Sequence, residues 1–241
     1  MTGIDSLLEL RGVTKTYGTG SAAFRALRGV DLSIERGEFV AIMGASGSGK
    51  STLMNILGCL DRPSEGQYLF GGLAVEALSK EERALLRRHY LGFVFQGFNL
   101  LARTSALENV ELPLLYRGVP RGERRARARR ALDDVGLLPW EKHAPNELSG
   151  GQQQRVAVAR AIAANPQVLF ADEPTGNLDS KVSEEVMGLI TDLNREKGIT
   201  VVMVTHEAEM AAHARRIVTV HDGLISSDEP NSPRVQIEEV A

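Results

Sequence analysis

The most constraining feature of the sequence is a glycine-rich segment between an apolar run and a helical pattern. The segment reads Gly44-Ala-Ser-Gly-Ser-Gly-Lys-Ser51. Phe39–Met43, directly before it, is a continuous apolar run of the kind found in strands buried on both faces. Residues 50–60 carry an apolar stripe at helical spacing. A strand, a tight loop and a helix in this order predict an α/β domain built on a parallel sheet.

Other short apolar runs extend the expected parallel sheet. They lie at residues 91–95, 168–171, 200–205 and 217–220, and we expect helices between them. Nearer the N-terminus, Leu8, Leu10 and Val13 and then residues 27–34 alternate apolar and polar side chains, as half-buried antiparallel strands do. Asp222-Gly223 between apolar pairs predicts a hairpin.

The middle of the chain has little strand character. Residues 105–117, 121–135 and 150–164 have helical patterns, so we expect a helical lobe inserted into the α/β core. We interpret residues 1–225 as one domain, with a core at 7–96 and 166–225 that includes an antiparallel β part, and a helical insertion at 97–165. The polar, proline-containing stretch 226–241 is expected to be a flexible tail.

The bulk properties are those of an ordinary globular protein. The chain has 241 residues and a net charge of −3, which gives no general attraction to nucleic acid or to an anionic membrane. Its one cysteine, Cys59, excludes an internal disulfide and suits a reducing compartment. Residues 1–6 lack the features of a signal peptide, and no apolar run reaches membrane-spanning length. We therefore expect a cytoplasmic protein whose membrane role comes from a partner.

The glycine-rich segment has the composition of a phosphate-binding loop. Gly44, Gly47 and Gly49 allow the unusual dihedral angles that let backbone N–H groups converge on an anion, and the following helix adds its positive end. Lys50 is placed to reach the β- and γ-phosphates of a nucleotide, and the Ser51 hydroxyl to bind Mg²⁺. A glycine-rich turn without a ligand would not explain this lysine and serine.

Polar side chains end three of the expected strands. Asp172 and Glu173 follow one apolar run, and two ionised acids side by side are costly without a cation. We expect Asp172 to hold Mg²⁺ and Glu173 to act as general base on a water molecule. His206 follows a second run and Gln96 a third. Most such histidines are ordinary hydrogen-bonding residues, but a position beside a γ-phosphate favours a functional role.

Two further features have simpler interpretations. Tyr17 precedes a glycine-containing loop and is suited to stacking on adenine, although an aromatic residue at a strand end is more often packed into the core. The basic run at residues 121–130 has no interleaved aromatic residues and contains helix-forming alanines. A solvated helix face is therefore favoured over a nucleic-acid site, and we expect no nucleic-acid partner.

A second glycine motif, Leu148-Ser-Gly-Gly-Gln152, lies about a hundred residues after the first. The phosphate-loop pattern alone arises by chance in roughly one chain in a hundred of this length, and this second string is rarer still. A serine and two glycines at the start of the helix expected at 150–164 make another anion-binding helix end. This second end belongs to the helical insertion, apart from the first loop.

Together these motifs resemble the ATP-binding cassette (ABC) ATPases over residues 8–225. The resemblance implies that Asp172 is the Walker B acid, that Glu173 is the catalytic base, and that His206 steadies the γ-phosphate. It implies that Gln96 senses Mg²⁺ and a permease, and that Asp179 lies in the D-loop. The resemblance also assigns ATP binding to Tyr17 and to the Walker A loop, which consists of Gly44, Ala45, Ser46, Gly47, Ser48, Gly49, Lys50, Ser51 and Thr52. It assigns metal binding to Ser51, Gln96 and Asp172. It identifies a signature loop at Leu148, Ser149, Gly150, Gly151 and Gln152.

The resemblance also implies how the protein assembles. Two cassettes of this family face head to tail, with each MgATP between the Walker A loop of one and the signature loop of the other. We therefore expect a homodimer that ATP closes and hydrolysis releases, on the cytoplasmic face of a bacterial inner membrane, where it drives separate permease subunits. A single-site P-loop kinase or GTPase is disfavoured, since it has no use for a signature loop.

Three segments resemble the macrolide-exporter and lipoprotein-release group in particular. They are residues 93–101, 104–110 and 171–179, with Gly97 as a small departure from the usual bulkier residue. Residues 98–101 (Phe-Asn-Leu-Leu) favour export of a macrolide, an antimicrobial peptide or a similar substrate, with a periplasmic adaptor as an optional further partner. A lipoprotein-releasing ATPase and a non-transport cell-division ATPase are the alternatives.

Overall fold

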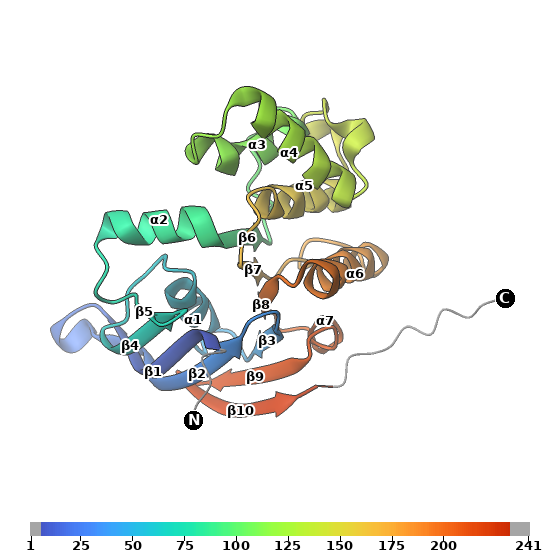
Figure 1. Cartoon of the computed structure of the whole chain (residues 1–241). Helices are drawn as coiled ribbons and strands as arrows, with labels where there is room; N and C mark the ends of the chain where they lie inside the picture. Colours follow the sequence, from blue (N-terminus) through green and yellow to red (C-terminus); the bar gives the residue numbers. More distant parts are fainter. Residues whose placement is uncertain (1–5, 232–241) are drawn as a thin grey trace.

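The computed structural model describes residues 6–231 and contains two sheets and a helical lobe (Figure 1). The strands are β1 (Ser6–Tyr17), β2 (Phe24–Glu35), β3 (Phe39–Met43), β4 (Glu65–Phe70), β5 (Leu73–Ala74), β6 (Leu91–Phe95), β7 (Val168–Asp172), β8 (Thr200–Val204), β9 (Arg216–His221) and β10 (Leu224–Pro230). The α-helices are α1 (Lys50–Leu57), α2 (Lys80–Tyr90), α3 (Ala106–Tyr116), α4 (Arg121–Asp134), α5 (Gly150–Ile162), α6 (Ser180–Lys197) and α7 (Ala208–Ala211).

The larger sheet has the strand order β10-β9-β3-β8-β7-β6. Its neighbours from β9 to β6 are parallel, and only β10 runs antiparallel. Every residue of β8 and the first four of β3 and β7 are buried, because apolar side chains cover both faces of the sheet. The predicted α/β class with a parallel sheet is confirmed.

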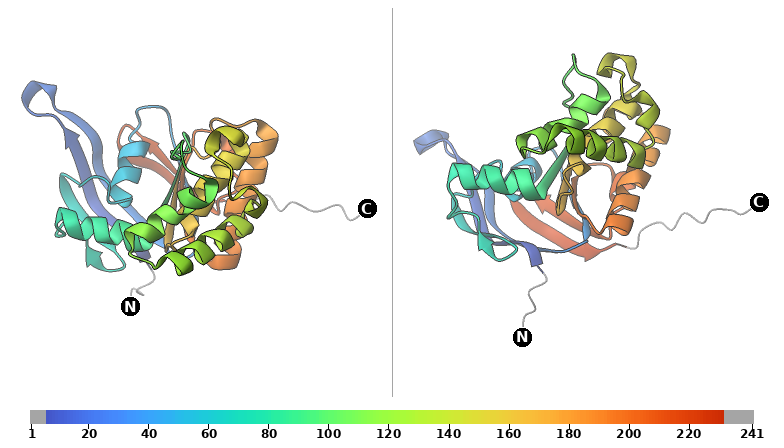
Figure 2. Two further views of the ribbon diagram at one scale, coloured as in Figure 1. Left: turned by 90° about the horizontal axis from the view of Figure 1, so that it is seen from above. Right: turned by 45° about the horizontal axis from the view of Figure 1, so that its top comes forward.

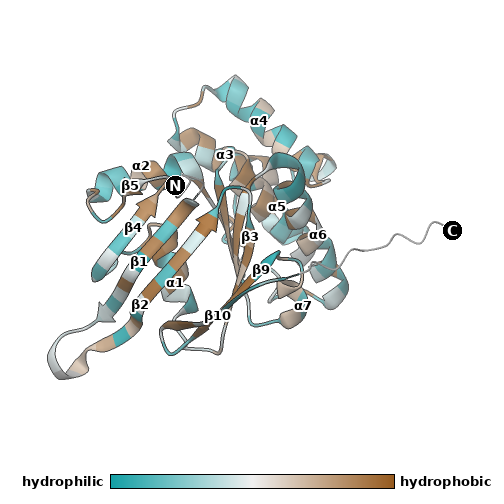
Figure 3. Cartoon of the chain, turned by 60° about the horizontal axis from the view of Figure 1, so that its bottom comes forward, coloured by the Kyte–Doolittle hydropathy of each residue, from teal (hydrophilic) through white to brown (hydrophobic). Residues whose placement is uncertain are grey.

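One face of this sheet shares a buried core with α1 and with the second, antiparallel sheet, whose order is β2-β1-β4-β5. Leu8, Leu10 and Val13 of β1 are buried in this core, as their alternation predicts. Figure 3 shows the apolar residues of β1 and β2 alternating with polar ones along each strand. The opposite face of the large sheet packs against residues of α5 and α6. The predicted antiparallel β part is therefore present.

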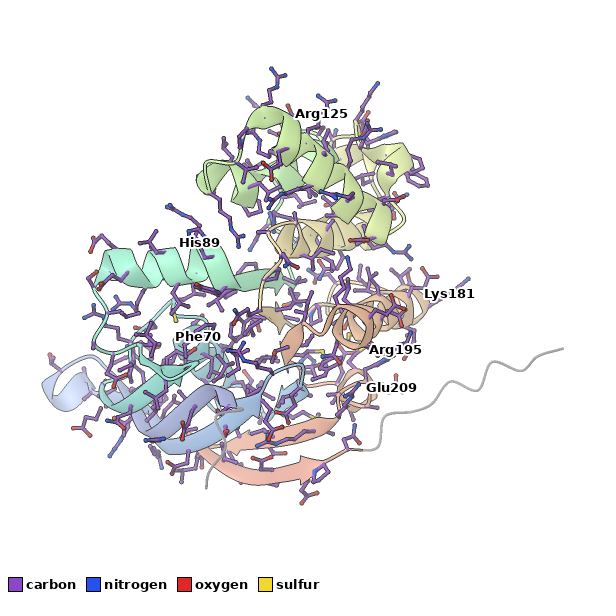
Figure 4. The ribbon with its side chains drawn as sticks, in the orientation of Figure 1. Phe70, His89, Arg125, Lys181, Arg195 and Glu209 are labelled. Atoms are coloured by element: carbon purple, nitrogen blue, oxygen red, sulfur yellow. The ribbon has the colours of Figure 1, made fainter. Side chains whose placement is uncertain are left out.

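Between β6 and β7 the chain leaves the sheet and forms α3, α4 and α5, which pack on one another as a helical lobe (Figures 1 and 2). Helix α5 also packs against β6 and α6 of the core. The basic run at 121–130 lies on α4, a mostly polar helix in Figure 3. Arg124 and Arg129 form ion pairs with Glu111 and Glu141, and Arg125 projects from the lobe away from the core (Figure 4).

Arg117 fastens the helical lobe to the core. It follows α3, and its guanidinium donates to the backbone oxygen of Arg88 (2.7 Å) and of His89 (2.9 Å) in α2 and to that of Ala164 after α5. One side chain therefore joins the ends of three helices. Partial burial lowers the pKa of Arg117, which still leaves it charged at neutral pH.

The prediction that a flexible tail begins at residue 226 is wrong. Residues 226–230 belong to β10, which pairs with β9 through the predicted Asp222-Gly223 turn. They read as a tail because they are polar, but an edge strand needs backbone partners on only one side and tolerates exposed polar side chains. Residues 232–241 of that prediction lie outside the described residues. Within residues 6–231, no helix is long and apolar enough to cross a membrane.

We predict that Arg117→Ala lowers the free energy of unfolding by about 1–3 kcal/mol, because three carbonyl oxygens at helix ends lose their donor. Urea denaturation measures this change. The exposed Arg121→Ala serves as control and should change stability by less than about 0.5 kcal/mol. Equal stability of Arg117→Ala and the control would contradict the fastening role.

Candidate functional site

The carboxyl ends of four neighbouring parallel strands meet in one row. Ile42 pairs with Val204, Val204 with Asp172, and Asp172 with Phe95. The residues that follow these positions therefore emerge at the same edge of the sheet. They include the glycine-rich loop, His206, Glu173 and Gln96, so the parallel register brings together the polar strand ends that the sequence singles out.

The glycine-rich loop runs from the end of β3 to the start of α1. A side chain on Gly44 would lie 2.2 Å from the backbone oxygen of Val220, and one on Gly49 would lie 2.8 Å from that of Ala26. Both glycines also have positive φ angles, of 150° and 111°. Only glycine fits at these two positions, because neighbouring backbone occupies the space of a Cβ.

The loop presents donors suited to an anion. Gly49 is the N-cap of α1 and makes no side-chain capping bond, so the first N–H groups of the helix are left for another acceptor. Lys50 is only 7% exposed, and its ammonium donates to the backbone oxygens of Gly44 (2.8 Å) and Ala45 (2.9 Å). The hydroxyl of Ser48 is buried without a hydrogen-bond partner among the described residues. These groups together fit phosphate oxygens.

Two acids lie beside this loop. Asp172 ends β7, and burial raises its pKa; the neighbouring Glu173 raises it further, against an opposing effect of Lys50. Glu173 has a φ of 44°, which is unusual for a residue with a side chain. Its carboxylate oxygen lies 2.9 Å from Nδ1 of His206. Strained backbone and paired titratable groups are typical of reaction centres.

Gln96 is held at the same edge. Its amide nitrogen lies 3.3 Å from the side-chain oxygen of Asn177, whose own amide donates to the backbone oxygen of Gln96 at 2.9 Å. Asn177 was not selected from the sequence, where nothing distinguishes it from an ordinary loop residue. Asp179, two residues later, caps α6 by accepting a hydrogen bond from the N–H of Val182 at 3.1 Å.

The oxygen atoms at this edge of the sheet are suitable ligands for Mg²⁺. Ser51, Gln96 and Asp172 offer a hydroxyl, an amide oxygen and a carboxylate, which are the hard oxygen ligands that Mg²⁺ prefers. Among residues 6–231 no three His, Cys, Asp or Glu side chains cluster as a metal site.

The signature loop forms the capped start of α5 in the helical lobe. Ser149 is exposed and caps α5, where it accepts from the N–H of Gln152 (3.3 Å), and the Gln152 side chain accepts from the N–H of Ser149 (2.9 Å). Leu148 is buried beneath the loop. A Cβ on Gly151 would lie 2.4 Å from the side chain of Val182, so the glycine lets α5 begin close against α6.

No hydrogen bond joins the signature loop to the glycine-rich loop in the part of the chain that the structure describes. A connection does run to the acidic edge through Gln154 of α5, which sequence reasoning missed. This side chain is fully buried and donates to the backbone oxygen of Pro174, next to Glu173, and to that of Phe95 (3.4 Å), next to Gln96. A glutamine inside a helix carries no sequence signal of such a role.

Comparisons with known proteins agree on one family. Residues 27–176 match the sequence model of the family described as ABC transporter. The chain is 55% identical over 223 residues, 92% of its length, to the pyoverdine export ATP-binding/permease protein PvdT of Pseudomonas syringae pv. syringae, and 53% identical over 234 residues, 97% of its length, to the macrolide export ATP-binding/permease protein MacB of Marinobacter nauticus. It spans 34% and 36% of these two proteins.

A solved structure resembles nearly the whole fold. It is the dimeric structure of the ATP-binding cassette MJ0796 in a post-hydrolysis state bound to ADP and Pi. The two chains are 48% identical with a TM-score of 0.84, over 93% of this chain and 99% of the other. The likeness therefore covers both the α/β core and the helical lobe.

We predict that Asp172→Asn raises the Tm of the nucleotide-free protein, since it removes a charge that burial and Glu173 disfavour. Because the carboxyl group is only half-buried and water screens it, we expect a gain of about one or two degrees. The raised pKa means that this gain is present at neutral pH, where Asp172 is ionised, and shrinks as the pH falls through that pKa toward the ordinary value of 3.8.

Calorimetry at pH 8 and at lower pH measures the difference between Asp172→Asn and wild type. Glu65→Gln, at an exposed position in β4, is the control and should leave Tm nearly unchanged. A lower Tm of Asp172→Asn at pH 8 would show that the carboxylate stabilises the fold instead.

Proposed function

The chain belongs to the ABC transporter family and is an ATPase of that family, and we propose that two copies close around two MgATP to drive a membrane permease for export. The observation that carries this proposal is the separation of two phosphate-binding loops onto different lobes. One lies in the α/β core beside Glu173 and His206, and the other is the exposed start of α5.

Hydrolysis is assigned to the edge of the large sheet. The N–H groups at the start of α1 and the ammonium of Lys50 bind the β- and γ-phosphates, once this ammonium exchanges its backbone acceptors for phosphate oxygens. Glu173 accepts the proton of the attacking water, and His206, hydrogen-bonded to it, steadies the γ-phosphate. Bound Mg²⁺, held by Ser51, Gln96 and Asp172, would offset phosphate charge.

The second loop completes a site on another copy of the chain. Ser149 is exposed at the N-terminal end of α5, where the first N–H groups of a helix have no backbone partner within it. A loop with this chemistry, without a bond to its own phosphate-binding loop in residues 6–231, is suited to a γ-phosphate presented by a partner. The dimeric state of the MJ0796 cassette supports this arrangement.

ATP then acts as a clamp between two subunits. The closed dimer contains phosphate contacts from both chains, so bound ATP favours it over separate subunits. Hydrolysis breaks the bond between the β- and γ-phosphates, so the contacts to the γ-phosphate are lost and the two subunits separate. Gln154 supports communication within each chain, since it joins the signature helix to the residues beside Glu173 and Gln96.

A groove beside Gln96 is suited to the permease. It has a volume of about 520 Å³ and lies between α2, β6, α3 and α5. Its lining combines apolar side chains, such as Leu60, Phe95 and Tyr116, with the basic Arg87 and Arg88. An apolar groove with basic side chains in its lining fits a short amphipathic segment. We assign it to a cytoplasmic segment of the permease, because the relatives are ATP-binding/permease proteins of which this chain covers about a third.

The relatives also favour export among the alternatives. Their names describe pyoverdine and macrolide exporters, and neither describes lipoprotein release or cell division. We therefore place the protein on the cytoplasmic face of the bacterial inner membrane, as the ATPase of an exporter for a macrolide, a peptide or a similar compound. A periplasmic adaptor would extend such a pathway outward.

We predict that Glu173→Gln lowers ATP turnover by about 10²–10⁴-fold, because the general base is lost while the phosphate-binding groups remain. With MgATP this variant should elute as a stable dimer in size-exclusion chromatography, and without nucleotide as a monomer. A variant that stays monomeric with ATP, or that hydrolyses it at the wild-type rate, would refute the role of Glu173.

We predict that Ser149→Arg abolishes hydrolysis but preserves ATP binding to the monomer, because the residue contacts only the nucleotide of the partner. Ser79→Arg is a matched control, since Ser79 is exposed and caps α2 with the same reciprocal bonds. Both changes remove a helix cap, at a cost of about 1 kcal/mol. If Ser149→Arg also loses monomer binding, or if the control loses hydrolysis equally, the shared site is wrong.

A further inference from the structure

Tyr17, the proposed stacking residue for adenine, is fastened by two charged neighbours. Its hydroxyl donates to a carboxylate oxygen of Asp61 at 2.9 Å. The ammonium of Lys15 lies 4.9 Å from the centre of the Tyr17 ring and donates to the other oxygen of Asp61 at 2.6 Å. The three side chains therefore form a closed set, with each one in contact with the other two.

Asp61 is itself anchored to the helix that begins at the phosphate-binding loop. The backbone N–H of Asp61 donates to the oxygen of Asn55 in α1 at 3.1 Å. Its carboxylate accepts from the N–H of Arg62 at 2.7 Å, and Lys15 donates to the backbone oxygen of Arg62 at 2.8 Å. The cluster thus joins the end of β1, which carries Tyr17, to the far end of α1.

The electrostatics keep this cluster charged. Burial alone would raise the pKa of Asp61, but the hydrogen bonds from Lys15, from the N–H of Arg62 and from Tyr17 lower it below its ordinary value. The side chains of Lys15 and Asp61 are 12% and 32% exposed, so water screens their attraction less than it screens an ion pair on the open surface. An acceptor for the Tyr17 hydroxyl is therefore present throughout the neutral pH range.

The same arrangement leaves one face of the ring free. Tyr17 is 40% exposed, whereas the Lys15 side chain beneath it is nearly buried. The ammonium of Lys15 lies over one face of the ring, so the other face is the one that a planar ligand can cover. Partial burial raises the pKa of the Tyr17 phenol, and the Asp61 carboxylate raises it further. The nearby Thr52 side chain has an opposing effect, so the phenol lies close to the first turn of α1.

We propose that Lys15 and Asp61 are positioning residues that hold the Tyr17 ring as a rigid platform for the base of a bound adenine nucleotide. The proposal rests on the proposed ATPase function and on the adenine-stacking role that the family resemblance implies for Tyr17. A ring that is already fixed increases the affinity for the nucleotide. A mobile ring would lose conformational freedom when the base stacks on it. That immobilisation lowers affinity by about three- to tenfold for one side chain.

Binding of ADP and of inorganic pyrophosphate tests this proposal, since only ADP carries a base and neither is hydrolysed. Isothermal titration calorimetry should show an about three- to tenfold weaker ADP affinity for Asp61→Ala, for Lys15→Met and for Tyr17→Phe, with unchanged pyrophosphate affinity. The double variant Asp61→Ala/Tyr17→Phe should lose no more than either single variant, because both remove the same hydrogen bond.

Asp31→Ala is the matched control, since Asp31 also binds β1, through the N–H of Gly12 at 2.8 Å, but lies outside the cluster. Its ADP affinity should equal that of wild type. If Tyr17→Ala weakens ADP binding but Asp61→Ala does not, the positioning role of Asp61 is wrong, whereas the stacking role of Tyr17 is retained. If Tyr17→Ala leaves ADP binding unchanged, the stacking role fails as well. A parallel loss of pyrophosphate binding, or an equal loss in Asp31→Ala, would mean that the substitutions only loosen the fold.

Discussion

The parallel register of four buried strands is the constraint on which the site depends. Ile42, Val204, Asp172 and Phe95 lie in one row across β3, β8, β7 and β6. The strands are held in this register by apolar side chains on both faces. A shift of one strand by one residue would move each of its side chains to the opposite face of the sheet. Packing far from the reacting groups therefore decides whether a lysine, two acids, a histidine and a glutamine converge.

This dependence explains why much of the site was predictable from the sequence. A strand buried on both faces is a continuous apolar run, so its end is visible as the first polar residue, as at Asp172 and Gln96. Once the runs are taken as neighbours in a parallel sheet, their ends must share an edge. The phosphate-binding loop needed no such step, because its glycines, lysine and serine are consecutive in the chain.

Contacts between distant segments were not predictable in the same way. Gln154 lies in the middle of a helix, and its bond to Pro174 exists only because α5 packs against the sheet edge. Asn177 and Asp61 read as ordinary loop residues, yet each fixes a candidate ligand-binding side chain. Residues 226–230 read as a tail because edge strands carry polar residues. In each case the tertiary partner, rather than the local pattern, determines the role.

The central claim is that each catalytic site takes its two phosphate-binding loops from different copies of the chain. Mixing two inactive variants, Lys50→Ala and Ser149→Arg, tests it most directly. A mixed dimer would contain one site with an intact Lys50 from one chain and an intact Ser149 from the other. The account predicts that ATP hydrolysis, absent from either variant alone, returns when the two are mixed. A mixture as inactive as its components would contradict a site shared between subunits.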